Sequence, residues 1–419
     1  MSALILVVFM GTAIAAMPIA HALLVAALAA VATTDRVPLD VVVQQMVAQV
    51  QSFPLIAIPF FMLTGSLMMG GKLGEALVGV LSALIGRYHG GPAQVGVLSS
   101  TLFGGVSGSA VADASAIGSL MIPWHKRLGY PAAFSAATLA AAATIDILIP
   151  PSIPLILFAL TANASIASLF VAGVLPGLLL CAGFMFACWW VGRRRNFPRD
   201  TAPFDAAAFR RHLLYALPAV VLPLLIIVFL RFGIATPTEV AVLSTLYAGL
   251  VSAVMYRDLT WSRLNAAIVH AGLATGVVLL VIMASSAIGW LLTFDQTPQG
   301  IAHWVQENVH AKWLVILLMN LMMLFLGMFI DLPAAVLLLA PVFVPLAQSI
   351  GMDMTQLGVM MVVNLAIGLY TPPVGTTLFI TSALAKVKVG QTVRELVPFY
   401  LVAFAVLGLV SYVPASILQ

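Results

Sequence analysis

Long apolar runs alternate with short polar clusters along the whole chain. A helix needs roughly 20 mostly apolar residues to cross a bilayer, and the pattern gives nine candidate spans. They lie near residues 4–31, 52–70, 132–163, 167–192, 213–230, 237–255, 267–292, 354–385 and 395–417. The pattern predicts an all-α polytopic membrane protein. The first run lacks a basic leader and a clear cleavage site, so we expect a retained span and not a signal peptide.

Two further apolar stretches, 90–124 and 313–348, do not fit single crossings. Each is interrupted near its middle, by GGVSGSA at 104–110 and by GMFIDLP at 327–333. Each also enters and leaves on one side when the other runs are threaded through a membrane. Non-helical backbone at membrane depth is tolerated only inside protein or against a cavity. We therefore predict two re-entrant helical hairpins with internal tips.

Prolines interrupt two of the predicted spans at matched positions. Proline removes a backbone donor and clashes with the preceding turn, so Pro150 and Pro151 break one span and Pro372 and Pro373 break another. An offset of 222 residues relates these pairs, and it also relates Gly105 to Gly327, Pro123 to Pro345 and Gly129 to Gly351. The repeat predicts two copies of a hairpin followed by a broken span, inverted relative to each other.

Composition and charge agree with a membrane protein. The chain is 62% hydrophobic and only 8% charged, which excludes an ordinary soluble domain. If the arginine-rich linker 193–212 is cytoplasmic, as the positive-inside rule indicates, only Arg36, Arg231 and Lys312 of the 18 basic residues fall on the opposite side. The net charge of +4 thus reflects topology, and we expect no nucleic-acid partner. Cys181 and Cys188 are expected to be reduced thiols.

These elements suggest a division of the chain into five parts. We predict scaffold spans and an interfacial arm at 1–89, a first transport half at 90–192 and a cytoplasmic linker at 193–212. A second scaffold part with its arm follows at 213–311, and a second transport half at 312–419.

The two breaks carry the candidate chemistry. Unwound backbone exposes carbonyl groups that suit a hard cation such as sodium, and half-helix N-termini favour anionic groups. Ser109 and Asp331 occupy equivalent positions in the two repeats. Each is interpreted either as a helix cap or as a ligand of the cation. Asp146, an ionisable group inside a span, is expected to have a coupling role, with a hydrogen-bonded buried carboxyl as the alternative. The candidate substrate-binding hydroxyls are those of Ser107, Ser109, Ser152, Thr371, Thr376 and Thr377.

Three motifs resemble one known family over nearly the whole chain. GGVSGSAVADASAIGSLMIP, IDILIPPSIPLILF and GLYTPPVGTTLFITSAL are similar to the large membrane subunit of tripartite ATP-independent periplasmic (TRAP) transporters, in the ion-transporter superfamily. The resemblance implies a sodium-coupled, elevator-type importer in the bacterial cytoplasmic membrane. It implies a carboxylate-bearing substrate, either a C4-dicarboxylate, sialic acid, sugar acid or keto acid. It also implies a small four-helix membrane subunit and a periplasmic substrate-binding protein as partners.

The resemblance further implies at least two co-transported sodium ions. One sodium region maps to Ser107, Gly108, Ser109, Pro150, Pro151 and Ser152. The other maps to Gly327, Asp331, Leu332, Thr371, Pro372, Val374 and Gly375.

Two rival functions remain at this point. GVSG at 105–108 has the form used by intramembrane serine proteases, in which a histidine activates the serine. Broken helices and hairpins also build passive channels. The duplicated double prolines favour a transporter over both, and we predict no enzymatic activity.

Overall fold

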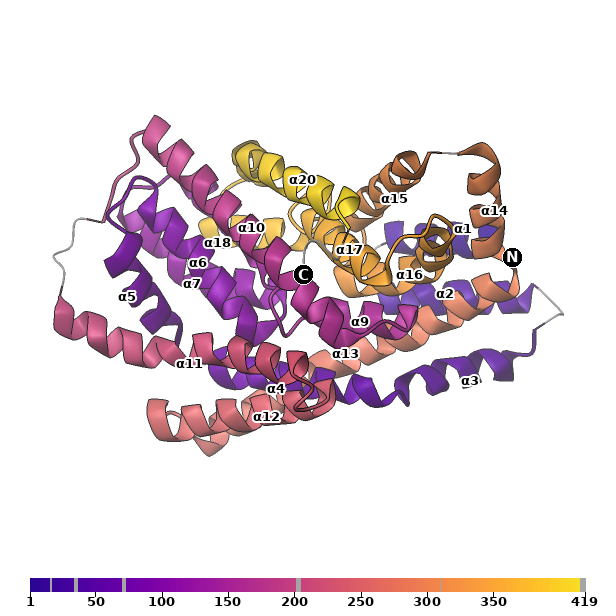
Figure 1. Ribbon diagram of the computed structural model, residues 1–419, viewed down its shortest axis with the longest axis horizontal. Helices are drawn as coiled ribbons and strands as arrows, with labels where there is room; N and C mark the ends of the chain where they lie inside the picture. Colours follow the sequence, from indigo (N-terminus) through magenta and orange to yellow (C-terminus); the bar gives the residue numbers. More distant parts are fainter. Residues whose placement is uncertain (16, 34–36, 70–72, 201–204, 310, 415–419) are drawn as a thin grey trace.

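The computed structural model describes residues 1–15, 17–33, 37–69, 73–200, 205–309 and 311–414. Every regular element in these ranges is helical, as predicted (Figure 1). The elements up to the linker are α1 (Ser2–Ile14), α2 (Ile19–Ala32), α3 (Leu39–Val50), η1 (Phe53–Ile56), α4 (Ala57–Met69), α5 (Leu73–Ile85), α6 (Gly91–Ser107), α7 (Ala110–Arg127), α8 (Ala132–Ala142), η2 (Ala143–Ile145), α9 (Ile153–Ala162) and α10 (Ile166–Arg194).

The second half of the chain repeats much of this order. Its elements are α11 (Ala206–Arg231), α12 (Pro237–Leu250), η3 (Val251–Tyr256), α13 (Trp261–Phe294), α14 (Thr297–Asn308), α15 (Lys312–Gly327), α16 (Leu332–Ser349), α17 (Met354–Gly368), α18 (Thr376–Ala385), α19 (Val389–Glu395) and α20 (Val397–Tyr412).

Several predicted spans are continuous helices. Among the described residues, five helices are long and apolar enough to cross a membrane, or up to seven if each of two bent pairs counts as one span. The predicted runs at 167–192, 213–230, 237–255 and 267–292 correspond to α10, α11, α12 with η3, and α13. The run at 52–70 belongs to a longer unit, because α3 and α4 form one of the bent pairs, with an angle of 59°.

Both predicted hairpins are present. In the first, α6 and α7 contact each other and reverse direction at Gly108, whose φ of +60° suits glycine. In the second, α15 and α16 contact each other across residues 328–331. The hairpins extend from opposite ends of the molecule, with α5 beside the first and α14 beside the second (Figure 1). The two copies are therefore inverted.

The helix boundaries follow the 222-residue offset of the sequence repeat. Helices α7 and α16 begin and end 222 residues apart, and so do the first residues of α8 and α17. Both broken spans contain a cis peptide bond, Pro150–Pro151 in one copy and Pro372–Pro373 in the other. The predicted duplication of hairpin and broken span is thus confirmed.

The first predicted span, 4–31, is wrong as a single crossing. It forms two helices, α1 and α2, which lie against each other (Figure 1). The helix cannot continue through Pro18, which stands at the N-cap of α2 with an extended backbone. The amino group of Met1 lies 3.5 Å from a carboxylate oxygen of Asp295, just past the end of α13. Helices α1 and α2 therefore form a third helical hairpin.

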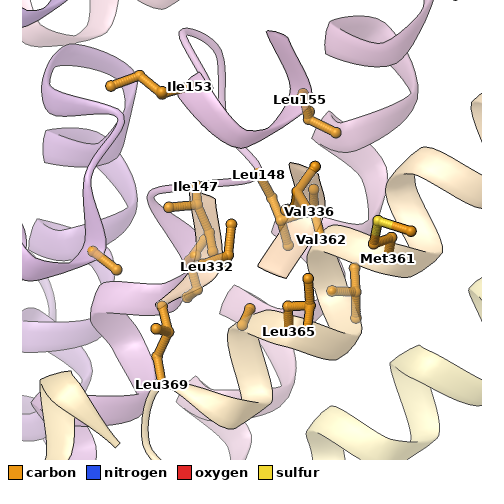
Figure 2. Close-up of a cluster of buried hydrophobic side chains, with 14 of the residues drawn as sticks. Ile147, Leu148, Ile153, Leu155, Leu332, Val336, Met361, Val362, Leu365 and Leu369 are labelled. Atoms are coloured by element: carbon orange, nitrogen blue, oxygen red, sulfur yellow. The ribbon is translucent and has the colours of Figure 1, made fainter. Parts of the chain in front are cut away.

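An apolar core joins the two predicted transport halves. Figure 2 shows Ile147 and Leu148 of the first break beside Leu332 and Val336 of α16. Leu365 of α17 lies in the same buried cluster. Because lipid tails are as apolar as these side chains, close van der Waals packing and not exclusion of water holds the two halves together here. The five-part division of the chain stays a prediction, because these contacts do not separate static parts from moving ones.

Candidate functional site

A cavity of about 310 Å³ lies where the tips of both predicted transport hairpins approach α13. We call it the central cavity. Its polar lining residues are Ser109 and Asp331, and none of its lining residues is lysine or arginine. The other lining residues are Met62, Gly108, Ala110, Val111, Ile147, Ile153, Pro154, Ala274, Val277, Val278, Leu332, Pro333 and Leu369.

Three helices begin at the central cavity. The first turns of α7, α9 and α16 all contribute to its wall. Ser109 caps α7 by accepting a hydrogen bond from the amide of Ala112 at 3.5 Å. Asp331 stands at the N-cap of α16 and its side chain makes no capping bond there. Because helix N-termini carry partial positive charge, the three together favour an anion in the cavity.

The first hairpin tip is fastened to the first break. The Ser107 hydroxyl donates to Oδ2 of Asp146 at 2.5 Å, and the Ser109 amide donates to the same oxygen at 3.2 Å. A Cβ atom on Gly108 would lie 2.4 Å from the carbonyl oxygen of Pro151. Only a residue without a side chain fits there. Asp146 is therefore hydrogen-bonded to the neighbouring hairpin, and its coupling role stays a prediction.

Two buried carboxylates lie in this half. Asp146 and Asp113 are both fully buried. Oδ1 of Asp146 and both carboxylate oxygens of Asp113 have no hydrogen-bond partner in the described part of the chain. A buried charge is costly unless it is paired or coordinates a cation. These oxygens are accordingly suited to hold a cation or a proton.

The second half is fastened through backbone contacts. The Val374 amide donates to the carbonyl oxygen of Met328 at 3.2 Å, which joins the second break to the second tip. A Cβ atom on Gly368 would lie 2.3 Å from the carbonyl oxygen of Gly327. The Thr371 hydroxyl donates to the Ile367 carbonyl at 2.6 Å, within its own turn.

Thr377 connects the two halves. Its buried hydroxyl lies 2.9 Å from the Leu369 carbonyl oxygen and 3.1 Å from the carbonyl oxygen of Ala140 on α8. The hydroxyl of Thr376 is buried without a partner among the described residues. Neither threonine lines the central cavity. Ser152 is also buried: it caps α9 and donates to the Ile147 carbonyl.

Most predicted site residues therefore do not line the cavity. Gly108, Ser109, Asp331 and Leu332 line it. The other predicted residues form the junctions between tips and breaks, and their ligand roles stay predictions: Ser107, Pro150, Pro151, Ser152, Gly327, Thr371, Pro372, Val374, Gly375, Thr376 and Thr377. Sequence reasoning missed Met62, Ala274, Val277 and Val278, because apolar residues inside an apolar span give no signal.

The two halves differ in charge. At the 222-residue offset, Asp146 corresponds to Gly368 and Asp113 corresponds to Ala335. The second half instead carries its acid at the tip, where Asp331 takes the place of Ser109. The backbone is duplicated, whereas the carboxylates are not.

The arrangement around Ser107 does not fit a serine protease. The recorded side-chain partner of its hydroxyl is a carboxylate, not an imidazole. The histidine in the same hairpin, His125, has its Nε2 2.9 Å from the carbonyl oxygen of Pro92. Activation of a serine nucleophile needs a base positioned on its hydroxyl.

Comparison with known proteins agrees with this geometry. The family model for the tripartite ATP-independent periplasmic transporter, DctM component, matches residues 6–416. An uncharacterized protein of Sinorhizobium fredii, y4mL, is 54% identical over 415 residues, with 99% of each chain covered. The 2,3-diketo-L-gulonate TRAP transporter large permease protein YiaN of Escherichia coli is 35% identical over 402 residues, which cover 96% of this chain and 94% of that protein.

A solved structure shares the fold. The YdaH transporter of Alcanivorax borkumensis, whose topology is described as unusual, aligns with a TM-score of 0.62 over 87% of this chain and 86% of that one, at 15% sequence identity. At this identity the likeness concerns the fold alone. Family membership follows from the sequence matches: this multi-pass membrane protein belongs to the DctM component family of tripartite ATP-independent periplasmic transporters.

Proposed function

We propose that this chain is the large permease subunit of a sodium-coupled importer for a carboxylate-bearing organic solute. The solute is a C4-dicarboxylate, sialic acid, sugar acid or keto acid. A periplasmic binding protein delivers it, and a small four-helix membrane subunit braces the permease. The transport step is an elevator movement of the hairpins and broken spans against the scaffold.

The observation that carries this proposal is the convergence of three helix N-termini and Asp331 on one cavity. The N-termini attract an anionic group, while the carboxylate of Asp331 repels it. No lysine or arginine in the lining balances these charges. Cations bound near the two tips would do so, which gives an electrostatic reason for coupling the solute to sodium.

The first sodium site is proposed at the junction of the first tip and first break. Sodium is a hard cation and prefers oxygen ligands. The free Oδ1 of Asp146 and the Pro151 carbonyl beside Gly108 supply oxygens there. The hydroxyl of Ser107 lies on the other oxygen of Asp146.

The second sodium site is proposed at the corresponding junction in the other half. Asp331 supplies a carboxylate, and the carbonyl groups of Gly327 and Thr371 lie beside close-packed glycines. Because each half surrounds one small cation, at least two sodium ions accompany each solute.

The elevator movement is supported by the contrast between two kinds of contact. Hydrogen bonds fasten each tip to its break, and Thr377 fastens one half to the other. The scaffold wall of the cavity consists instead of Met62, Ala274, Val277 and Val278. An apolar wall lets the fastened unit slide without breaking hydrogen bonds.

Uptake into proteoliposomes tests the proposal. The permease, the small subunit and the binding protein are reconstituted together, and the sodium gradient, proton gradient and membrane potential are varied independently. The probes are succinate, N-acetylneuraminate, 2,3-diketogulonate and pyruvate. We expect uptake of at least one acid to follow the sodium gradient. Uptake that follows only the proton gradient would refute sodium coupling, and equilibration without any gradient dependence would indicate a passive channel.

A further inference from the structure

A second cavity of about 300 Å³ adjoins the central one. We call it the distal cavity. The two cavities share Val277, Val278, Asp331 and Pro333 in their walls. Asp331 therefore stands at the boundary between them. A solute held by its carboxylate at the first hairpin tip has room to extend past Asp331 into the distal cavity.

The far wall of the distal cavity comes from the start of α2. Residues Pro18 to His21 line it. These residues begin the second helix of the α1–α2 hairpin, which replaces the single span expected from the sequence and whose second helix contacts α13. The hairpin thus brings a histidine to a place that one continuous crossing does not predict.

His21 is chemically isolated among the lining residues of the two cavities. Beyond Asp331, the distal cavity is lined by apolar groups of α13 and α16, namely Leu280, Val281 and Ala334. Neither cavity is lined by lysine or arginine, and His21 is the one histidine among the lining residues of the two cavities. An imidazole can both donate and accept hydrogen bonds, and it can carry a positive charge. In the other repeat, the position of His21 is held by Leu243.

We propose that the distal cavity is the second half of the substrate chamber and that His21 is a specificity-determining residue in it. This inference rests on the proposed function. The carboxylate of the solute occupies the central cavity at the helix N-termini, and hydroxyl groups along the solute donate to Asp331. The second polar end, a carboxylate or a hydroxyl-bearing chain, is held by the imidazole of His21.

The proposal selects among solutes by length. A dicarboxylate or a sugar acid has a second polar end that reaches His21. A short keto acid such as pyruvate fills the central cavity and leaves His21 without contact. The solutes that fit both cavities are therefore elongated acids with polar groups at both ends.

Three variants test the role of His21. His21→Leu removes all hydrogen bonding, whereas His21→Gln keeps a donor and an acceptor but cannot be charged. The matched control is His303→Gln, because His303 is exposed on α14, pairs with Glu307 and lies in neither cavity. Each variant is reconstituted with both partner proteins, and KM and kcat are measured for succinate, N-acetylneuraminate, 2,3-diketogulonate and pyruvate.

We expect His21→Leu to raise KM about tenfold or more for the best elongated acid, the size of one lost hydrogen bond to a charged group. KM for pyruvate, where uptake is measurable, and the sodium dependence should not change. His21→Gln should fall between wild type and His21→Leu, and His303→Gln should match wild type.

Three outcomes would overturn the inference. In the first, His21→Leu keeps the wild-type KM and the wild-type preference among the acids. In the second, kcat falls equally for all acids at constant KM, which indicates a structural role. In the third, the wild type transports pyruvate but no elongated acid. If the wild type transports none of the four acids, the proposed substrate class fails first and the inference fails with it.

Discussion

Gly108 and Pro151 meet where the first hairpin touches the first broken span, so closely that a Cβ on the glycine would lie 2.4 Å from the proline's carbonyl oxygen. The glycine also has a φ of +60°. Two separate physical costs would therefore accompany any side chain at this position, one from backbone strain and one from steric overlap at a proposed ion ligand.

Gly108→Ala should reduce both stability and transport. Gly351→Ala is the matched control, because Gly351 has a φ of +64° but nothing within 4 Å of a Cβ atom. Both variants should lose roughly 1–2 kcal/mol from the left-handed backbone. Only Gly108→Ala should lose further stability and sodium-dependent uptake. Thermal unfolding in detergent and uptake in proteoliposomes measure the two effects, and equal behaviour of the variants would count against the tip–break contact.

Asp146→Asn should weaken sodium binding. The amide keeps an acceptor for Ser107 but removes the charge and changes the free oxygen of the carboxylate. We expect the sodium concentration for half-maximal uptake to rise about tenfold or more, the loss typical of a contact to a charged group. Co-purification with the small subunit should be unaffected. An unchanged sodium dependence would remove Asp146 from the proposed site.

Asp331→Asn should alter sodium and solute dependence together. Asp331 borders both cavities and belongs to the proposed second sodium site. Removing its charge lessens both cation attraction and anion repulsion in the cavity. The sodium concentration for half-maximal uptake should rise, and the Hill coefficient of uptake for sodium should fall. Initial rates over a matrix of sodium and solute concentrations distinguish this from simple loss of activity.

Thr377→Val should affect stability and leave ion dependence alone. The Thr377 hydroxyl lies within hydrogen-bond distance of carbonyl oxygens in both broken spans. Thr381→Val is the control, because the Thr381 hydroxyl donates only within its own helix. We expect Thr377→Val to lose about 1 kcal/mol more than the control. A rise in the KM for the solute would instead support the predicted substrate-binding role of Thr377.

Disulfide trapping should separate the moving unit from the scaffold. Cys181 and Cys188 are first replaced. The pair Gly289→Cys with Pro341→Cys joins the second hairpin to α13, where a Cβ atom on Gly289 would lie 4.0 Å from that of Pro341, within the range of disulfides. The pair Met328→Cys with Val374→Cys lies within the proposed moving unit, across a backbone hydrogen bond.

Oxidation should stop uptake only in the pair that joins hairpin to scaffold, and a reductant should restore it. The internal pair should transport normally when oxidised. If the internal disulfide blocks uptake and the scaffold disulfide does not, the proposed division between static and moving parts is wrong.

The sequence was sufficient to predict the repeat, because prolines and glycines report directly on backbone geometry. Pro150, Pro151, Pro372 and Pro373 placed both breaks correctly, and the hairpin tips followed from small and polar residues inside apolar runs. The α1–α2 hairpin was missed although Pro18 marked its turn. A single proline in an apolar run also occurs in kinked continuous helices, so it did not distinguish a reversal of direction from a bend.

The candidate site was only partly accessible from sequence for a different reason. A hydroxyl group beside a break can face a cavity or donate back to a carbonyl group. The spacing of residues in the sequence does not distinguish these two orientations. Thr377 and Ser152 turned out to bond backbone carbonyls. The apolar wall of α13 and the position of His21 depend on how distant helices meet, which no local pattern encodes.

The bend between α3 and α4 has a consequence for the second state of the transporter. Its repeat counterpart, offset by 222 residues, is α13, which runs unbroken from Trp261 to Phe294. One motif is thus held in two shapes at once, bent by 59° in one copy and continuous in the other. Both shapes belong to the proposed scaffold, which stays static during the elevator movement. The wall that the moving halves face is therefore asymmetric, so the two end positions of the movement differ in their surroundings although the moving halves are copies of one motif.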